Sequence, residues 1–512
     1  MRSNGDLSLA EVRLRGAALA VLTMLSRLPF RSSYAYHWDS LNFLFAMRTF
    51  DLLHEQPQPP GYPLYVLAGR AAAALLGDDH TALVALSLIA SGVAVLFLYL
   101  LGRQFAGEFV GLASALMLAT SPLLWFYGEV ALPHAVDLAW VALTLWLLAR
   151  VRRDRPGWWV GAVVALAVTG GFRPQTLIFL LPVALYAFWP LGWRRLVQAA
   201  LLGFVLSLLW AVPMVASCGG LGPYLRYTAA YSSRFMAHTS VFRGAGLEGV
   251  RYNARRLVLY TAYAVGAGWL GLLMLVPSFV RRQCGTTWPA MMRWSLLWAL
   301  PPLAFYLFVH MGQQGLVFVF LPVLLLWSAT GMALAGRWRR LLLTMVVLVN
   351  GAVFLLAPEY PLGEQGPRLL TRATLVRHDA MLEARLARLR TFLPDSTAVE
   401  AEMWRFVEYY APTYPLLPLD EAPPNRPAAL TPRRWPDAGH FGPADLGLEP
   451  TPLGQWFVVL FDEGALYGYP PRDEAARRLH IFTLAHGEPF GVVALEADEA
   501  IDYGDRGWTV VP

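Results

Sequence analysis

The sequence contains no lysine, so all 41 of its basic residues are arginine. Cysteine is nearly absent too, since only Cys218 and Cys284 occur, and nothing in this count indicates redox chemistry. Charged residues make up only 15% of the 512 residues, whereas hydrophobic residues make up 56%. A soluble protein of this size cannot bury so much apolar surface in one core. The composition therefore indicates a protein that faces lipid.

The positive charge of the chain has a ready explanation in a membrane protein. In a soluble protein the formal net charge of +6 would suggest an anionic partner such as nucleic acid. In a membrane protein basic side chains instead set the orientation of the spans. We therefore expect no nucleic-acid partner. The exclusive use of arginine is compatible with codon bias, although arginine also suits bidentate binding of phosphate.

Apolar runs of the length that a bilayer requires recur along the first 357 residues. We predict about eleven transmembrane helices, at residues 14–30, 80–102, 107–127, 131–150, 157–171, 174–190, 196–217, 257–280, 293–310, 315–334 and 340–357. The fifth and sixth spans are short, and only the residues from Gly170 to Pro174 separate them. One kinked element is the alternative there, and it would invert the orientation of everything that follows.

Arginine collects on one side of the membrane when the N-terminus is placed in the cytoplasm. The cytoplasmic segments then hold Arg13, Arg15, Arg103, Arg150, Arg152, Arg153, Arg155, Arg194, Arg195, Arg281, Arg282, Arg293, Arg337, Arg339 and Arg340. The short outer connections at 128–130 and 311–314 contain no arginine. This asymmetry follows the positive-inside rule and argues against the single kinked element. Arg27 closes the first span, an uncleaved anchor, and we expect its side chain to reach the outer interface.

The predicted fold is a polytopic α-helical membrane domain at residues 1–357, followed by a small soluble α/β domain at 358–512. The outer face carries the loops 31–79 and 218–256 and this C-terminal domain, so Cys218 and Cys284 lie on opposite sides and are not expected to form a disulfide. In the C-terminal domain we predict a helix at 376–393, strands at 456–461 and 491–495, and an extended proline-rich loop at 411–455. We expect a multi-pass protein of the inner, or plasma, membrane.

Acidic residues stand at the outer ends of several predicted spans. Asp39 follows the first span among aromatic residues, where a partly desolvated carboxylate could act as a general base or simply cap a helix. Glu129 ends the third span, and His134 and Asp137 share one face at the start of the fourth. These side chains form either a functional polar cluster or a structural hydrogen-bonded pair. With Asp39 they could also hold a divalent cation, although their spacing is a weak metal signal.

Arginines outside the cytoplasmic segments need another explanation. Arg173 lies in an outer connection too short to require it, and a phosphate partner would explain it. The loop 218–256 adds Arg226, Arg234 and Arg255, which would bind a substrate phosphate or lipid headgroups in general. His310, Gln313 and Gln314 form a further polar group, suited either to a sugar or to helix capping.

An acidic base and a group of arginines on one face are what glycosyl transfer from a lipid phosphate needs. The base takes a proton from the acceptor hydroxyl, while the arginines stabilise the departing phosphate, which requires no general acid. We take Asp39 and Glu129 as candidate catalytic residues. The candidate substrate-binding residues are His37, Gln58, Tyr62, His134, Asp137, Arg173, Arg226, Arg234, Arg255, His310, Gln313 and Gln314.

Four motifs between residue 31 and about residue 330 resemble the GT-C superfamily of membrane glycosyltransferases. They are Trp38-Asp39-Ser40, Pro59-Pro60-Gly61-Tyr62-Pro63-Leu64-Tyr65, Gly171-Phe172-Arg173-Pro174 and His310-Met311-Gly312-Gln313-Gln314-Gly315. The resemblance is strongest to the branches akin to protein O-mannosyltransferases, glycosyltransferase family 39 and DUF2723. It implies a polyprenyl-phosphate-linked sugar donor and a catalytic role for Asp39. Relatives commonly have histidine where this chain has Gln58. If that histidine binds metal or substrate in the relatives, the contact is altered here.

Two other classes of function remain open from the sequence. A transporter or flippase of lipid-linked saccharides should carry its ionisable residues near the bilayer midplane, often on broken helices. Here they cluster at span ends. A non-catalytic relative whose outer domain binds a partner would be compatible with the change at Gln58. The sugar and the acceptor, whether protein, lipid or glycan, do not follow from these residues.

Overall fold

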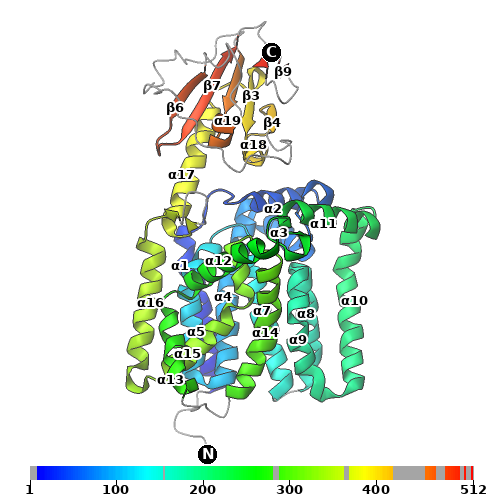
Figure 1. The fold of residues 1–512 in the computed structure, drawn as a ribbon, viewed down its shortest axis with the longest axis vertical. Coiled ribbons are helices and arrows are strands. Elements are labelled where there is room, and N and C mark those ends of the chain that lie inside the picture. Colours follow the sequence, from blue (N-terminus) through cyan, green and yellow to red (C-terminus); the bar gives the residue numbers. More distant parts are fainter. Residues whose placement is uncertain are drawn as a thin grey trace, which may run out of the picture. The chain divides into compact units, whose positions relative to one another are not determined.

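The structure is a computed structural model that describes residues 8–153, 156–280, 288–361, 368–418, 456–468, 479–495, 501–502 and 509–510. The chain divides into two compact units, each described by itself (Figure 1). The helical unit comprises residues 1–35 and 42–375, and the C-terminal unit comprises 36–41 and 376–512. The division therefore falls beyond residue 358, where the composition changes, and it assigns Tyr36–Leu41 to the C-terminal unit.

Helices build almost all of the helical unit. They are α1 (Leu9–Arg27), α3 (Pro63–Leu76), α4 (Asp79–Ala106), α5 (Glu108–Thr120), α6 (Pro122–Tyr127), α7 (His134–Arg153), α8 (Trp159–Phe172), α9 (Pro174–Phe188), α10 (Trp193–Ser217), α11 (Leu221–Met236), α12 (Gly246–Val265), α13 (Trp269–Val280), α14 (Trp288–Phe308), α15 (Leu321–Ala333) and α16 (Arg339–Leu356). Two more, α2 (Trp38–Arg48) and α17 (Arg372–Leu389), cross the division between the units. A short hairpin pairs β1 (Tyr360–Pro361) with β2 (Arg368–Leu369).

Each predicted span coincides with one helix or with two consecutive helices. Among the described residues, six helical stretches are long and apolar enough to cross a membrane: 79–106, 134–153, 174–191, 193–217, 246–277 and 336–356. Other apolar helices are shorter, at 63–76, 108–120, 156–172 and 321–333. The helical character of the protein is thus confirmed, while the number of about eleven spans remains a prediction.

The helices α8 and α9 form a hairpin rather than one kinked span. Arg173 separates them in an extended conformation, with φ −154° and ψ 101°. At this end Asp137 on α7 bonds both Arg173 and Thr176. Near the other end Arg152, also on α7, donates to the carbonyl of Tyr186 on α9. From the joint, α9 therefore extends beside α7 to the other end of that helix. Because α8 and α9 run in opposite directions, the alternative of a single kinked span is wrong.

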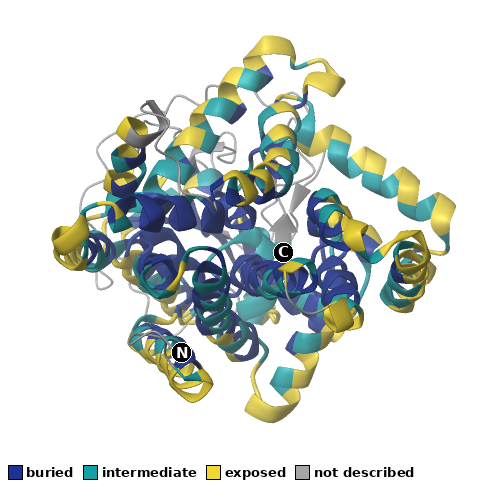
Figure 2. Ribbon diagram, turned by 90° about the horizontal axis from the view of Figure 1, so that it is seen from below, coloured by how far each residue is buried: buried dark blue, intermediate teal, exposed yellow. Residues whose placement is uncertain are grey.

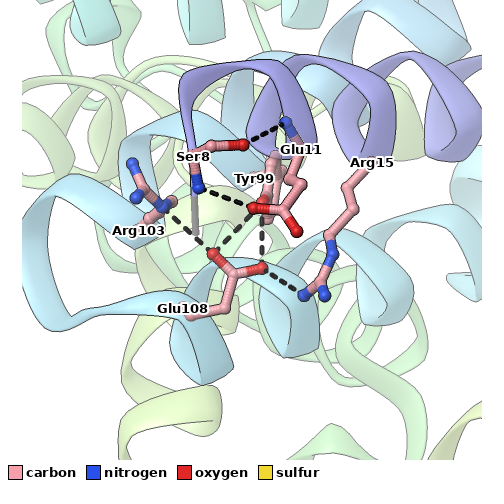
Figure 3. A network of polar contacts seen from close by, with 6 residues as sticks. All are labelled: Ser8, Glu11, Arg15, Tyr99, Arg103 and Glu108. Carbon is pink, nitrogen blue, oxygen red and sulfur yellow. Dashed lines mark hydrogen bonds and ion pairs between the residues drawn. The ribbon is translucent and has the colours of Figure 1, made fainter. Parts of the chain in front are cut away.

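Buried residues gather toward the middle of the helical unit, and exposed residues lie on its outward helix faces (Figure 2). Helix α1 begins with a capping box of Ser8 and Glu11 (Figure 3). At its other end Arg27 is 0% exposed and donates to the carbonyls of Thr23 and Ala119. The expectation that Arg27 reaches the outer interface is therefore wrong. Its guanidinium instead turns inward, where backbone carbonyls accept its hydrogen bonds.

One carboxylate joins three helices at the end of the helical unit where α1 begins. Glu108 opens α5 and accepts hydrogen bonds from Arg15 on α1, and from Tyr99 and Arg103 on α4 (Figure 3). Both arginines belong to the set predicted to be cytoplasmic. Arg281 and Arg282 of that set lie outside the described residues, as do Arg155 and Cys284.

The C-terminal unit is an α/β fold around a five-stranded mixed sheet. The strands β3 (Thr397–Ala401), β4 (Leu416–Pro418), β5 (Trp456–Leu460), β6 (Leu479–Thr483) and β7 (Pro489–Leu495) lie in the order β4-β3-β5-β7-β6. β3 runs parallel to both neighbours, whereas β7 runs antiparallel to β5 and β6. A separate hairpin pairs β8 (Ile501–Asp502) with β9 (Thr509–Val510).

The predicted elements of this unit are found close to their expected positions. Helix α17 and the strands β5 and β7 confirm the predicted helix and strands, and the unit adds α18 (Trp404–Tyr410) and α19 (Glu463–Gly468). Of the predicted proline-rich loop, residues 416–418 form β4, and residues 419–455 lie outside the described part of the chain.

Candidate functional site

The joint between α8 and α9 holds a buried ion pair. The side chains of Arg173 and Asp137 are 5% and 3% exposed, and Arg173 Nη1 lies 3.3 Å from Asp137 Oδ2. Thr176, in the first turn of α9, donates to the same oxygen at 3.1 Å. Tyr62 before α3 and Tyr306 on α14 are also near enough to Arg173 to affect its pKa. Four parts of the chain thus contribute residues to this group.

Three polar atoms in this group have no hydrogen-bond partner among the described residues. They are Nε of Arg173, Oδ1 of Asp137 and the hydroxyl of Tyr306, all buried. Buried polar atoms in folded proteins are normally hydrogen-bonded, and leaving one unmet costs about 1–3 kcal/mol. The three atoms therefore mark a place that can accept a polar ligand carrying both donors and acceptors, such as a phosphate or a sugar. We call this group the Arg173 cluster.

The most specific sequence motif supplies one wall of the Arg173 cluster. Tyr62 precedes α3 with φ 48°, in the left-handed region that a bulky residue rarely adopts. It is buried at 8% exposure, and its ring meets Phe43 edge-on at 5.2 Å. Nearby Gln58 is also buried, and its Oε1 has no hydrogen-bond partner among the described residues. Such backbone strain is typical of functional loops and must be offset by the surrounding packing.

His134 faces a different part of the unit from Asp137. Its Nε2 lies 2.6 Å from Oε1 of Gln313, and its ring meets Tyr127 edge-on. Gln313 and Gln314 precede and begin the short helix η7 (Gln314–Val319). The sequence placed His134 and Asp137 on one helix face, but the two side chains bond separate partners. Only Asp137 belongs to the Arg173 cluster.

His310 forms a third polar group together with α12. Its Nδ1 lies 3.0 Å from the hydroxyl of Thr239. Arg256 on α12 donates to the carbonyl of Gly312, and Asn253 accepts from the backbone N–H of Met311. These contacts hold the connection after α14 in place, which favours a structural role for His310.

Glu129 lies in the connection between α6 and α7. Its side chain is 0% exposed, and neither carboxylate oxygen has a hydrogen-bond partner within the described parts of the chain. Two arginines act on it electrostatically, Arg27 from α1 and Arg372 from the start of α17. The guanidinium of Arg27 lies over Trp125, and that of Arg372 lies over Phe30. We call this group the Glu129 cluster.

Contacts within the helical unit hold the segment that carries Arg372. Gln314 donates from Nε2 to the carbonyl of Arg368 at 2.7 Å, and Tyr263 donates to the carbonyl of Leu370 at 2.9 Å. The sequence analysis did not select Arg27, Arg372 or Tyr306 for the site. Nothing in their sequence positions reveals these long-range contacts.

Arg372→Ala should destabilise the protein increasingly as the pH rises. Burial raises the pKa of Glu129, and the charges of Arg27 and Arg372 oppose that shift. Without Arg372 the folded-state pKa rises further, so ionised Glu129 costs more stability, whereas protonated Glu129 is hardly affected. The loss therefore appears as the pH rises through the folded-state pKa of Glu129, which lies above the unfolded value of about 4.3. Melting temperatures of the purified variant across a pH series measure it.

Two further variants decide whether Glu129 causes this pH dependence. In a Glu129→Gln background, Arg372→Ala should produce a small change that does not depend on pH. Arg251→Ala is the matched control, because Arg251 is exposed and its ion pair is with Glu248, three residues earlier on the same helix. A pH-dependent loss that persists in the Glu129→Gln background would contradict the assignment.

Comparisons with known proteins extend over most of the chain. Residues 57–216 match the model of the dolichyl-phosphate-mannose-protein mannosyltransferase family. Over 95% of this chain and 98% of that chain, the structure resembles ArnT from Cupriavidus metallidurans bound to undecaprenyl phosphate, with a TM-score of 0.54 and 12% identity. The apo form of ArnT gives the same TM-score with 14% identity, over 94% and 97% of the chains. The chain has the GT-C fold.

A weaker likeness concerns another GT-C protein, the oligosaccharyltransferase of Archaeoglobus fulgidus. Its TM-score is 0.46 at 13% identity, over 88% of this chain and 70% of that one. No curated protein sequence matches the chain. The predicted resemblance to GT-C glycosyltransferases is confirmed.

The segment that matches the family model contains several residues of the polar groups described above. Residues 57–216 include Gln58, Tyr62 and Glu129, as well as both partners of the ion pair, Asp137 and Arg173. They exclude Tyr306, which reaches the Arg173 cluster from α14. They also exclude Asp39. The Arg173 cluster therefore combines matched residues with one residue that the family model does not cover.

Other predicted site residues lie at exposed positions of the GT-C fold. Arg226 and Arg234 lie on α11 and Arg255 lies on α12, all exposed. Arg234 approaches Glu55 at 3.9 Å and stacks on Phe235. Among the described residues, these three arginines have no hydrogen bond, ion pair or ring contact with the Arg173 cluster. The binding of lipid headgroups therefore explains them as well as substrate binding does.

Asp39 lies in the first turn of α2 and belongs to the C-terminal unit. Its backbone N–H donates to Nδ1 of His37 at 3.1 Å, and its carboxylate approaches the same nitrogen at 3.9 Å. Its side chain is 21% exposed. Among the residues that the structure describes, no group of three or more His, Cys, Asp or Glu side chains could hold a metal ion.

Proposed function

We propose that this protein transfers a sugar from a polyprenyl-phosphate donor to an acceptor hydroxyl on the extracytoplasmic face of the inner membrane. The observation that carries the proposal is the buried Arg173, which pairs with Asp137 beside polar atoms that have no hydrogen-bond partner among the described residues. Arginine is suited to phosphate because its planar donors match phosphate oxygens. ArnT, which shares the fold, has been solved with undecaprenyl phosphate.

In the proposed reaction, the acceptor hydroxyl attacks the anomeric carbon of the donor as Asp39 takes its proton. The bond to the phosphate oxygen breaks, and Arg173 stabilises the charge that develops on the leaving polyprenyl phosphate. Direct attack predicts inversion at the anomeric carbon of a hexosyl or pentosyl group. Glu129 is a second carboxylate for the acceptor hydroxyl, and His37 is positioned to orient Asp39.

The C-terminal unit is proposed to lie outside the cytoplasm with the Arg173 cluster. The positive-inside pattern supports this orientation, and the hairpin of α8 and α9 supports the number of crossings on which it depends. Cysteines introduced singly into the C-terminal unit of the intact protein should react with a membrane-impermeant thiol reagent in whole spheroplasts. Labelling only after lysis would contradict the orientation.

The experiment that tests the function is a transfer assay with purified full-length protein in nanodiscs. A panel of polyprenyl-phosphate-linked hexoses and pentoses is supplied, and release of free polyprenyl phosphate is measured together with sugar on the acceptor. We expect release and transfer to occur in equal amounts. A flippase would move the intact lipid-linked sugar across proteoliposomes without releasing polyprenyl phosphate, and that result would overturn the proposal.

A further inference from the structure

The segment that carries Asp39 packs on the C-terminal unit. Within this unit the indole of Trp38 meets that of Trp404 edge-on, with ring centroids 5.3 Å apart. The guanidinium of Arg405 lies 5.6 Å from the centroid of Trp38 and 5.3 Å from that of Trp404. Arg405 is only 6% exposed. One buried cation therefore contacts two aromatic rings, one of which directly precedes Asp39.

A second ring contact holds the other side of His37. Tyr36 packs on His378 of α17, with ring centroids 5.1 Å apart. His378 in turn lies 6.1 Å from the ring of Phe406 on α18. The backbone at positions 36 and 38 is thus anchored on either side of His37. The turn that begins α2 follows at once, because Ser40 donates its N–H to the carbonyl of His37.

The start of α18, which supplies Trp404 and Arg405, is itself held firmly. Asp462 is buried, and its carboxylate accepts hydrogen bonds from the backbone N–H groups of Glu402, Met403 and Ala465. Glu402 and Met403 directly precede α18. Carboxylate bonds to backbone N–H groups are strong because the acceptor is charged. Asp462 thereby ties the start of α18 to the end of β5.

We propose that Trp404 and Arg405 are positioning residues that hold the turn of Trp38 and Asp39. This inference rests on the proposed function, in which Asp39 is the base. A desolvated cation–π contact and an edge-on aromatic pair each stabilise the arrangement beyond the area that they bury. Such contacts restrict a loop whose catalytic side chain must lie within roughly 0.5 Å of its productive position. Trp404 and Arg405 thus act on the reaction through Asp39, without contacting the substrate themselves.

The first test compares two arginines of the C-terminal unit. Arg405→Ala should lower kcat by about one to two orders of magnitude while the donor KM changes little, because a displaced base slows chemistry without weakening donor binding. Arg405→Lys, which keeps a cation over the rings, should restore part of the rate. Arg388→Ala is the matched control, since Arg388 stacks on Phe482 away from Trp38. An unchanged kcat in Arg405→Ala, or an equal loss in Arg388→Ala, would overturn the proposal.

The second test does not depend on activity. Trp38→Leu and Arg405→Ala are combined in the full-length protein, and the melting temperature of each single and double variant is measured. We expect the double variant to lose clearly less than the sum of the single losses, because both remove one contact. Additive losses would show that Arg405 does not act on Trp38. If the wild type transfers no sugar, the proposed function fails, yet this cycle still decides whether the contact exists.

Discussion

Asp39→Asn should lower the rate of sugar transfer by roughly 10²- to 10⁴-fold, which is the contribution expected of a general base. Asparagine has the same size as aspartate and can still accept hydrogen bonds, but it cannot take the proton from the acceptor hydroxyl. Asp39 lies in the first turn of α2 at a partly exposed position, so the substitution should leave expression and melting temperature nearly unchanged. Single-turnover transfer with a saturating lipid donor measures the effect.

Asp51→Asn is the matched control for the Asp39 variant. Asp51 lies in the same predicted outer loop, where it accepts from the backbone N–H of Leu53 and pairs with exposed His54. We expect this variant to transfer sugar at nearly the normal rate. If Asp39→Asn also retained the normal rate, Asp39 would not be the base, and Glu129 would become the candidate.

Arg173→Gln should reduce kcat/KM for the donor by about 10²- to 10³-fold, the size of effect seen when a group that stabilises developing negative charge is removed. The loss should fall on both KM and kcat, because Arg173 is proposed to contact the phosphate before and during departure. The variant also leaves Asp137 buried without its ion-pair partner, which by itself destabilises a protein by about 3–5 kcal/mol. Activity must therefore be compared at equal amounts of folded protein.

Asp137→Asn separates the two effects of the Arg173 variant. It breaks the same ion pair, yet it leaves the guanidinium and its charge in place. We expect it to lose thermal stability but to keep a much larger part of its donor affinity than Arg173→Gln. Equal losses of donor affinity in the two variants would mean that the ion pair supports the fold and that Arg173 does not contact the phosphate.

The sequence predicts the helical architecture well, because lipid requires long apolar runs whose composition is easy to recognise. It also identifies Arg173 as exceptional, since a basic residue in a short outer connection lacks a topological reason. The prediction from sequence fails at Arg27. Because this residue ends a predicted span, its side chain is expected to extend to the outer interface. The carbonyl of Ala119, which accepts from Arg27, belongs to a helix far along the chain.

The composition of the clusters depends on contacts that no local pattern reveals. Tyr306 lies in an apolar run of α14 that reads only as membrane span, yet it reaches the Arg173 cluster. Arg372 follows the last span and acts on Glu129, from which more than two hundred residues separate it. Likewise the assignment of Trp38 to the C-terminal unit follows from its packing with Trp404 and Arg405, which a change in composition near residue 358 cannot indicate.

The position of a bound lipid phosphate tests the central claim most directly. An experimental structure of the full-length protein in nanodiscs with polyprenyl phosphate should show the phosphate within hydrogen-bonding distance of Arg173 and the hydroxyl of Tyr306. The same density should be absent from a structure of Arg173→Gln prepared in the same way. A phosphate ordered elsewhere in the protein, and unaffected by that substitution, would contradict the proposed donor site.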